Sequence, residues 1–135
     1  MSFESGAFQQ RAAPLLAEME ASANAHDTDR YLAAYFRDAA LTFTTNGEII
    51  RGWDSLRERR RQWWKDGKAT ALYDYLGEPT FEAFSKDLGL TTHLTAARLG
   101  LPDGQVRERQ LVFTALWRRR EEGRRIIYAH ESSKK

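Results

Sequence analysis

The residues best suited to proton transfer in this sequence are His93 and Asp74. A histidine titrates near neutrality, so His93 could accept a proton as a general base. Asp74 lies between Tyr73 and Tyr75, and a tyrosine near a carboxylate base could polarise a substrate carbonyl group. The structural alternatives are a core histidine that is hydrogen-bonded to a neighbouring threonine hydroxyl, and an aspartate on the solvent side of a strand.

Signals for a metal or a cofactor are weak in this chain. Its three histidines, His26, His93 and His130, are isolated and lack the spacing of metal-ligand pairs. There are no cysteines, which excludes disulfides and thiolate ligands. The sequence has no phosphate-binding loop, no dinucleotide-binding glycine motif and no nucleophile elbow. We therefore expect neither a metal nor a cofactor.

Three helices are expected to position these groups. Residues 8–23 carry one apolar stripe, although Pro14 requires that helix to begin near it or to kink there. Asp27 is a suitable N-cap for a second helix, which presents an aromatic face. The third helix follows Gly52, and we expect it to place its apolar and tryptophan side chains on one side and the arginines of residues 57–61 on the other.

The rest of the chain predicts antiparallel strands joined by tight turns. Residues 40–45 alternate, and Asn46-Gly47 is a strong hairpin signal before a return strand. From residue 69 onward the alternation has a period of two. It is interrupted at residues 77–79, where Pro79 cannot donate a ladder hydrogen bond and a bulge is expected. Helices gathered on one face of an antiparallel sheet make an α+β fold.

The composition is that of one globular domain. The chain has 135 residues, of which 41% are hydrophobic and 30% are charged. No apolar run approaches the roughly 20 residues of a membrane span, and the first residues lack a secretory signal, so we expect a cytoplasmic protein. The net charge is only +2, and the arginine clusters are interleaved with glutamates. This pattern favours solvated faces over nucleic-acid binding.

The order of these elements resembles the NTF2-like superfamily of cone-shaped α+β barrels, which includes SnoaL-like and DUF4440-type proteins, ketosteroid isomerases and the association domain of calcium/calmodulin-dependent kinase II. The likeness rests on residues 35–41 (YFRDAAL) followed by 51–57 (RGWDSLR), on the strand end at 117–119 (WRR), and on 130–132 (HES). The last segment is similar to the closing His-x-Ser of DUF4440 and kinase-association sequences. The resemblance covers about residues 12–132 and implies a strongly curved antiparallel sheet covered by N-terminal helices.

The resemblance implies less about activity. Ketosteroid isomerases have a carboxylate base at the end of the first strand, where residues 41–45 of this chain contain no carboxylate. Residues 111–117, where the acid donor should lie, contain none either. In kinase-association domains arginines on the two central strands line the pocket, and the matching positions here are Thr95 and Ala115. We therefore expect neither steroid isomerisation nor an anionic ligand held in that way.

What the resemblance does imply is a concave surface rich in aromatic side chains. We expect this surface to bind a small, largely apolar or aromatic molecule. If the protein is an enzyme, we expect it to catalyse proton transfer without a cofactor, as an isomerase, cyclase or lyase does, with His93 or Asp74 as the base. The residues expected to line the pocket are Tyr35, Phe43, Trp64, Tyr73, His93, Thr95, Phe113, Ala115, Trp117, Tyr128 and His130.

The alternative interpretation is a non-catalytic module for dimerisation or protein docking. Val112, Thr114 and Leu116 alternate with the inward side chains of their strand, so they fall on its outer face. That face is too apolar to leave in water, which predicts a homodimer formed through it. For His130 the alternative to a pocket role is structural, since it could orient the last strand against the helices.

Overall fold

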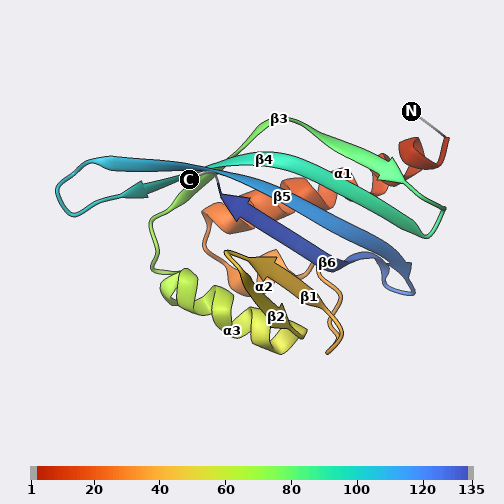
Figure 1. Ribbon diagram of the computed structural model, residues 1–135, viewed down its shortest axis with the longest axis horizontal. Coiled ribbons are helices and arrows are strands. Elements are labelled where there is room, and N and C mark those ends of the chain that lie inside the picture. The colour runs from red at the N-terminus through yellow and green to blue at the C-terminus, as the bar shows by residue number, and fades with distance from the viewer. Residues whose placement is uncertain (1–2, 134–135) are drawn as a thin grey trace.

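The helices of the computed structural model, which describes residues 3–133, form one layer (Figure 1). Helix α1 spans Phe3–Asn24, α2 spans Thr28–Leu32, and α3 spans Trp53–Trp63 and leads into a 3₁₀ turn at Lys65–Gly67. Helix α1 continues through Pro14 instead of beginning near it. Its apolar stripe is buried on both sides of the proline, so packing outweighs the one backbone hydrogen bond that proline cannot donate.

The sheet has six strands, in the order β2-β1-β6-β5-β4-β3. All neighbours are antiparallel except β1 and β6, which pair in parallel, so the sheet is mixed and the expectation of a purely antiparallel sheet was wrong at this pair. It is strongly curved but open, with β2 and β3 at its edges. The strands are β1 (Thr42–Thr45), β2 (Glu48–Arg51), β3 (Leu72–Ala83), β4 (Leu88–Gly100), β5 (Val106–Arg120) and β6 (Gly123–Ser133).

Local backbone chemistry explains the predicted hairpin and bulge. Asn46 and Gly47 both have positive φ, 48° and 79°, as the two central residues of a type I′ hairpin turn require. The register between β3 and β4 shifts between Leu76 and Thr80, and Gly77 within this bulge has a φ of 71°. Both predictions from the sequence are confirmed.

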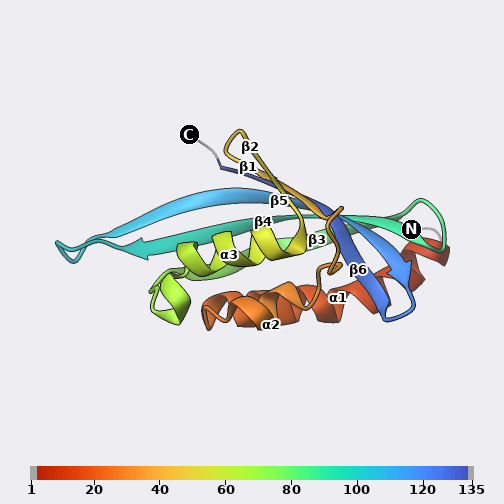
Figure 2. The ribbon, with the colours of Figure 1, turned by 90° about the horizontal axis from the view of Figure 1, so that it is seen from below.

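All three helices lie against the concave face of the sheet (Figure 2), and the β4–β5 hairpin extends beyond them (Figure 1). Side chains of α1 also cover the free edge of β3. Asn24 accepts a hydrogen bond from the backbone N–H of Tyr73 at 2.6 Å and donates one to its carbonyl oxygen at 2.8 Å. Glu20 accepts another from the backbone N–H of Tyr75 at 2.6 Å. An edge strand whose backbone groups are already bonded offers little to another chain.

The concave face and the helices enclose the core. Odd-numbered residues of β4 and β5 point toward the helices, and even-numbered ones point outward, as expected from the alternation. No helix within residues 3–133 has both the length and the apolar character needed to cross a membrane. The fully buried large side chains of the core include Met19, Leu32, Leu41, Phe43, Leu56, Trp64, Trp117 and Ile126.

Candidate functional site

A cavity of about 340 Å³ lies between α3 and the concave face of the sheet. Its wall combines aromatic and aliphatic side chains with a few charged groups. The α3 side contributes tryptophans and arginines, and the remainder comes from all six strands, the β1–β2 turn and the segment before β3. The lining residues are Thr45, Asn46, Glu48, Arg59, Arg60, Trp63, Trp64, Ala71, Tyr73, Ala97, Leu99, Arg109, Leu111, Glu131 and Ser133.

A smaller inner chamber of about 30 Å³ lies deeper in the cone. It has room for one or two water molecules at about 10–15 Å³ each. Its own lining includes Tyr31, Tyr75, His93, Thr95 and Phe113. The two spaces share five lining residues and therefore adjoin each other; the outer cavity carries most of the charged side chains, and the inner chamber is lined mainly by aromatic ones. The shared residues are Arg60, Trp64, Tyr73, Leu111 and Glu131.

His93 lies at this inner end, packed between two aromatic rings. Its ring centroid is 4.0 Å from that of Tyr75 and 5.2 Å from that of Phe113. The Nδ1 atom is buried and has no hydrogen-bond partner among the described residues. Burial lowers the pKa of His93 from its ordinary value of 6.5 to about 4. The imidazole is therefore neutral at pH 7 and a weaker base than an exposed histidine.

The candidate partners of this histidine were Thr91 and Thr95, and of these Thr91 is hydrogen-bonded to another side chain. Thr91 accepts a hydrogen bond from Trp117 Nε1 at 2.9 Å, and both side chains are fully buried. One further polar contact orients the aromatic wall of the cavity. Trp64 Nε1 donates to the Tyr73 hydroxyl at 3.0 Å. Burial also raises the pKa of Tyr75, so this hydroxyl remains protonated and can only accept or donate as a neutral group.

Arg60 is the functional candidate that the sequence analysis missed. It is 6% exposed, and its guanidinium lies 4.8–5.4 Å from the ring centroids of four aromatic residues. Its Nε and Nη2 atoms are buried without a hydrogen-bond partner among residues 3–133. The signal was present in the spacing, because positions 56, 60, 63 and 64 fall on one helical stripe. The rings are those of Tyr31, Phe43, Trp63 and Trp64.

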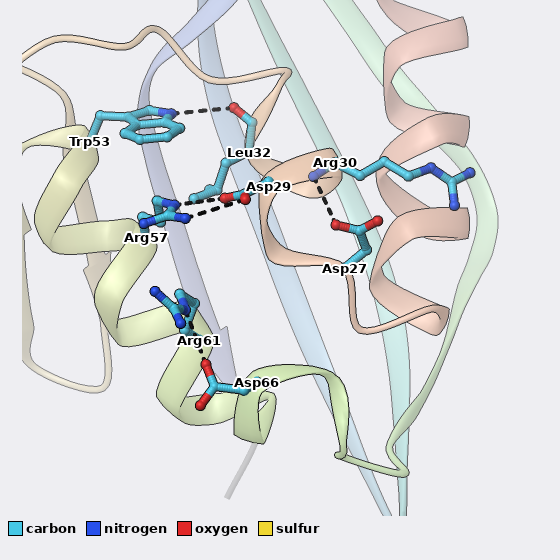
Figure 3. Close-up of polar contacts among 8 residues, drawn as sticks. All are labelled: Asp27, Asp29, Arg30, Leu32, Trp53, Arg57, Arg61 and Asp66. Carbon is cyan, nitrogen blue, oxygen red and sulfur yellow. Dashed lines mark hydrogen bonds and ion pairs between the residues drawn. The ribbon is translucent and has the colours of Figure 1, made fainter.

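The other arginines of α3 are paired at the surface. Arg57 bonds Asp29 of α2 through Nε and Nη2, at 2.7 and 3.3 Å, and Arg61 Nε bonds Asp66 at 3.0 Å (Figure 3). Arg59 pairs in the same two-pronged way with Glu48 of β2. Each of these charges is thus locally neutralised, which leaves little free positive charge on this helix for a phosphate backbone.

Five of the residues predicted for the pocket border the two cavities. They are Trp64, Tyr73, His93, Thr95 and Phe113. Four others, Tyr35, Phe43, Ala115 and Trp117, face the same side but are fully packed in the hydrophobic core and border neither cavity. In this fold the pocket wall and the core are one continuous surface, so sequence alternation alone does not separate them.

Three predicted site residues lie on the opposite, convex face of the sheet, so their assignment to the cavity was wrong. Asp74 alternates with the inward Tyr73 and is exposed, 3.9 Å from Arg98. Tyr128 and His130 are exposed and hydrogen-bond with Thr44 there. The cause of the second error is a register shift opposite Leu116 and Trp117, which inserts one extra residue in β6. This bulge reverses the alternation and turns Glu131 inward.

A resident metal ion has no obvious ligand set here. Within the part of the chain that the structure describes, no three histidine, aspartate or glutamate side chains gather closely enough to hold one. The inner end of the cavity instead offers one guanidinium, one carboxylate and one neutral imidazole. These groups can bind complementary polar groups of a ligand.

Comparison with known proteins identifies the fold. No protein-family model matches the sequence, and no functionally curated protein matches it. Among solved structures, an NTF2-like protein of unknown function from Shewanella oneidensis matches with a TM-score of 0.79 and 19% identity, over 92% of this chain and 98% of that one. An NTF2-like superfamily protein from Salmonella enterica matches with a TM-score of 0.82 and 13% identity, over 96% and 93%.

The association domain of C. elegans CaMKII has a TM-score of 0.76 and 16% identity, over 97% of this chain and 99% of that one. Identities this low show a common fold and carry no activity across. Other matching structures are described as having a cystatin-like fold. The chain therefore adopts the NTF2-like, cystatin-like α+β fold that the sequence resemblance implied.

Proposed function

We propose that this protein binds a small molecule with an apolar or aromatic body in the cavity between α3 and the sheet. The observation that supports this best is the cavity itself, whose volume of about 340 Å³ lies within the usual range for small-molecule sites. Its wall presents the rings of Trp63, Trp64 and Tyr73 next to the aliphatic Leu111. A flat ligand placed there would bury most of its surface against side chains that are already held in place.

A cavity-filling substitution tests this proposal directly. Ala97 of β4 borders the cavity and is 7% exposed, so Ala97→Phe would occupy space that a ligand needs. Thr92→Phe, on the same strand but on the opposite face, is the matched control. The probes are indole and phenylacetamide, two neutral planar molecules. Binding is followed by NMR shifts of the backbone amides of Tyr73 and Leu111.

We expect the wild type and Thr92→Phe to bind at least one probe with a dissociation constant on the order of millimolar, as is usual for molecules of this size. We expect Ala97→Phe to lose that binding while it keeps its fold. The proposal fails if no probe shifts these amides up to roughly 10 mM, or if Ala97→Phe binds as well as the control does.

Of the two bases that the sequence suggested for proton transfer, only His93 borders this site, because Asp74 lies on the other face. A tyrosine at the inner chamber, Tyr73 or Tyr75, would then be the electrophilic partner. The lowered pKa of His93 makes it a weak base at neutrality, so ligand binding has better support than catalysis. Once a substrate is known, an unchanged turnover in His93→Gln would exclude His93 as the base.

A second candidate function is dimerisation or docking through the convex face of the sheet. The large side chains that remain exposed on this face include Leu72 at 54%, Val112 at 42% and Tyr128 at 37%. A stable partner would need to cover about 800 Å² there. Sedimentation velocity should show a dimer at micromolar concentration and a monomer for Val112→Lys. A wild type that is entirely monomeric under these conditions would exclude the homodimer.

A further inference from the structure

Arg60 of α3 occupies a core position, where a charged side chain is not expected. Arg60 follows Leu56 by four residues and therefore lies on the side of α3 that faces the core, next to Trp64. A core position on a helix ordinarily holds an aliphatic side chain. A guanidinium is costly there unless acceptors satisfy its N–H groups. Arg60 also borders both the outer cavity and the inner chamber, so any ligand that reaches deep into the cone meets it.

The unsatisfied edge of Arg60, formed by Nε and Nη2, is one of the two edges with which arginine binds carboxylates. Arg57, one turn earlier on α3, uses its Nε and Nη2 atoms to hold both oxygens of Asp29 (Figure 3). In Arg60 these same two atoms have no partner among the described residues. The aromatic rings around Arg60 stabilise its charge through cation–π contacts but cannot replace two hydrogen-bond acceptors.

The charge of Arg60 is permanent. Burial by itself would lower the pKa of this guanidinium, but the nearby Tyr31, Glu131 and other groups outweigh it, so the pKa lies above its ordinary value. The site consequently cannot become neutral by losing a proton. Because Nε and Nη2 are shielded from water, hydrogen bonds formed there to an anion would be strong.

Glu131 of β6 supplies a second, opposite charge at the same place. It borders both the cavity and the inner chamber and acts electrostatically on Arg60. Nevertheless, among residues 3–133 it forms no ion pair with Arg60 or with any other cation within 4.0 Å. The inner end of the site therefore holds an unpartnered guanidinium edge, which a turn of the Arg60 side chain would present to the cavity, next to a carboxylate without an ion pair among the described residues.

We propose that Arg60 and Glu131 recognise a small carboxylate that has an aromatic body and a hydrogen-bond donor next to the carboxylate, as in a 2-hydroxy acid. The ligand carboxylate accepts from Nε and Nη2 of Arg60, whose side chain turns this edge toward the cavity that it already borders. The neighbouring hydroxyl of the ligand donates to Glu131. The aromatic body then lies against Trp63 and Tyr73. This inference rests on the proposed function, since it names the ligand class for the same cavity.

Three matched probes separate charge from shape. Mandelate has the carboxylate, the hydroxyl and the ring; phenylacetate lacks the hydroxyl; phenylacetamide lacks both the hydroxyl and the charge. Affinities are measured by NMR titration of the protein, with the Nε–H signal of Arg60 as a direct reporter. In the wild type we expect mandelate to bind about tenfold to a hundredfold more tightly than phenylacetamide, and phenylacetate to fall between them.

Variants assign these preferences to residues. Arg60→Gln should weaken the binding of mandelate about tenfold to a hundredfold and leave the affinity for phenylacetamide nearly unchanged. Arg60→Lys, which keeps the charge but lacks the planar edge, should recover part of the lost affinity for mandelate. Glu131→Gln should remove the advantage of mandelate over phenylacetate. Arg57→Gln is the matched control, and we expect wild-type affinities for it. A merely structural role of Arg60 would weaken all three probes alike.

The outcomes also separate this inference from the proposed function. If phenylacetamide binds as tightly as mandelate in the wild type, the cavity is a small-molecule site but Arg60 does not recognise an anion. This comparison needs no variant, so it decides the matter even if Arg60→Gln does not fold. If none of the probes binds up to roughly 10 mM, the proposed function itself is refuted and the inference falls with it.

Discussion

His93 should make the stability of this protein fall on mild acidification. Its ring is packed between Tyr75 and Phe113 and is only 6% exposed, so the charged form is excluded from the native state. In the unfolded chain the same histidine is solvated and has its ordinary pKa. The perturbation is a decrease in pH, and the comparison is between the wild type and His93→Gln, in which position 93 does not titrate.

The sign and the size follow from the two pKa values of His93. Burial lowers its pKa from 6.5 to about 4 in the native protein, so between these values the unfolded state binds a proton that the native state does not. The contribution of the neutral, buried His93 to the free energy of unfolding is therefore fully present above about pH 6.5, and it is lost as the pH falls toward 4. The complete loss is about 3 kcal/mol, of which about 2 kcal/mol falls between pH 7 and pH 5.

The assay is urea unfolding at several pH values from about 7 to 5, with extrapolation to water. Carboxylates with lowered pKa values, such as Glu48 and Asp29, also titrate on acidification, but they are common to both proteins and cancel in the difference. We expect the wild type to lose about 2 kcal/mol more than His93→Gln over this range. His130→Gln, on the exposed convex face, keeps His93 and should keep this loss. Identical pH dependence in the wild type and His93→Gln would refute the reasoning.

Two further predictions concern how α1 packs on the sheet. A Cβ atom added to Gly89 of β4 would lie 2.7 Å from the ring of the buried Phe8, so Gly89→Ala should destabilise the protein by about 1–3 kcal/mol. The control is Gly100→Ala on the same strand, where the added Cβ meets no atom within 4 Å. This variant should lose less than about 0.5 kcal/mol of stability. Equal unfolding midpoints for the two alanine variants would contradict the packing. Asn24→Ala leaves the backbone N–H and carbonyl of Tyr73 without their partner, and it should cost about 1 kcal/mol for each group because water can partly replace the side chain at this edge strand. Thermal unfolding measures this loss, and an unchanged midpoint would show that these bonds contribute nothing.

The elements that the sequence predicts well are those fixed by local chemistry. The Asn46-Gly47 turn requires positive φ at two successive residues, and few other residue pairs allow it. The bulge before Thr80 follows from a glycine and a proline that cannot both sit in a regular ladder. The parallel pairing of β1 with β6 joins residues more than eighty positions apart, for example Thr42 and Tyr128. No local pattern encodes such a pairing.

The misplacement of Tyr128 and His130 has one physical cause in β6. A strict alternation from the inward Ile126 would place Tyr128 and His130 inside the cone as well. The single extra residue in β6 reverses the faces, so Glu131 points inward in their place. A bulge of this kind has no glycine or proline to mark it in the sequence. It exchanges an imidazole and a phenol for a carboxylate, and this changes the chemistry of the whole site.

Two buried polar groups without hydrogen-bond partners among residues 3–133 lie at the same inner end of the cavity. A core selected only for stability would have a leucine or methionine at position 60. A buried guanidinium with two unsatisfied N–H groups destabilises the native state, and the aromatic contacts of Arg60 do not replace the missing hydrogen bonds. The buried Nδ1 of His93, also without a partner, borders the inner chamber that Arg60 borders. Natural proteins keep such conflicts between local rules and packing mainly at functional or strained sites. A polar ligand that supplied the missing hydrogen bonds to Arg60 and His93 would remove this destabilisation. This gain would favour its binding at this end of the cone.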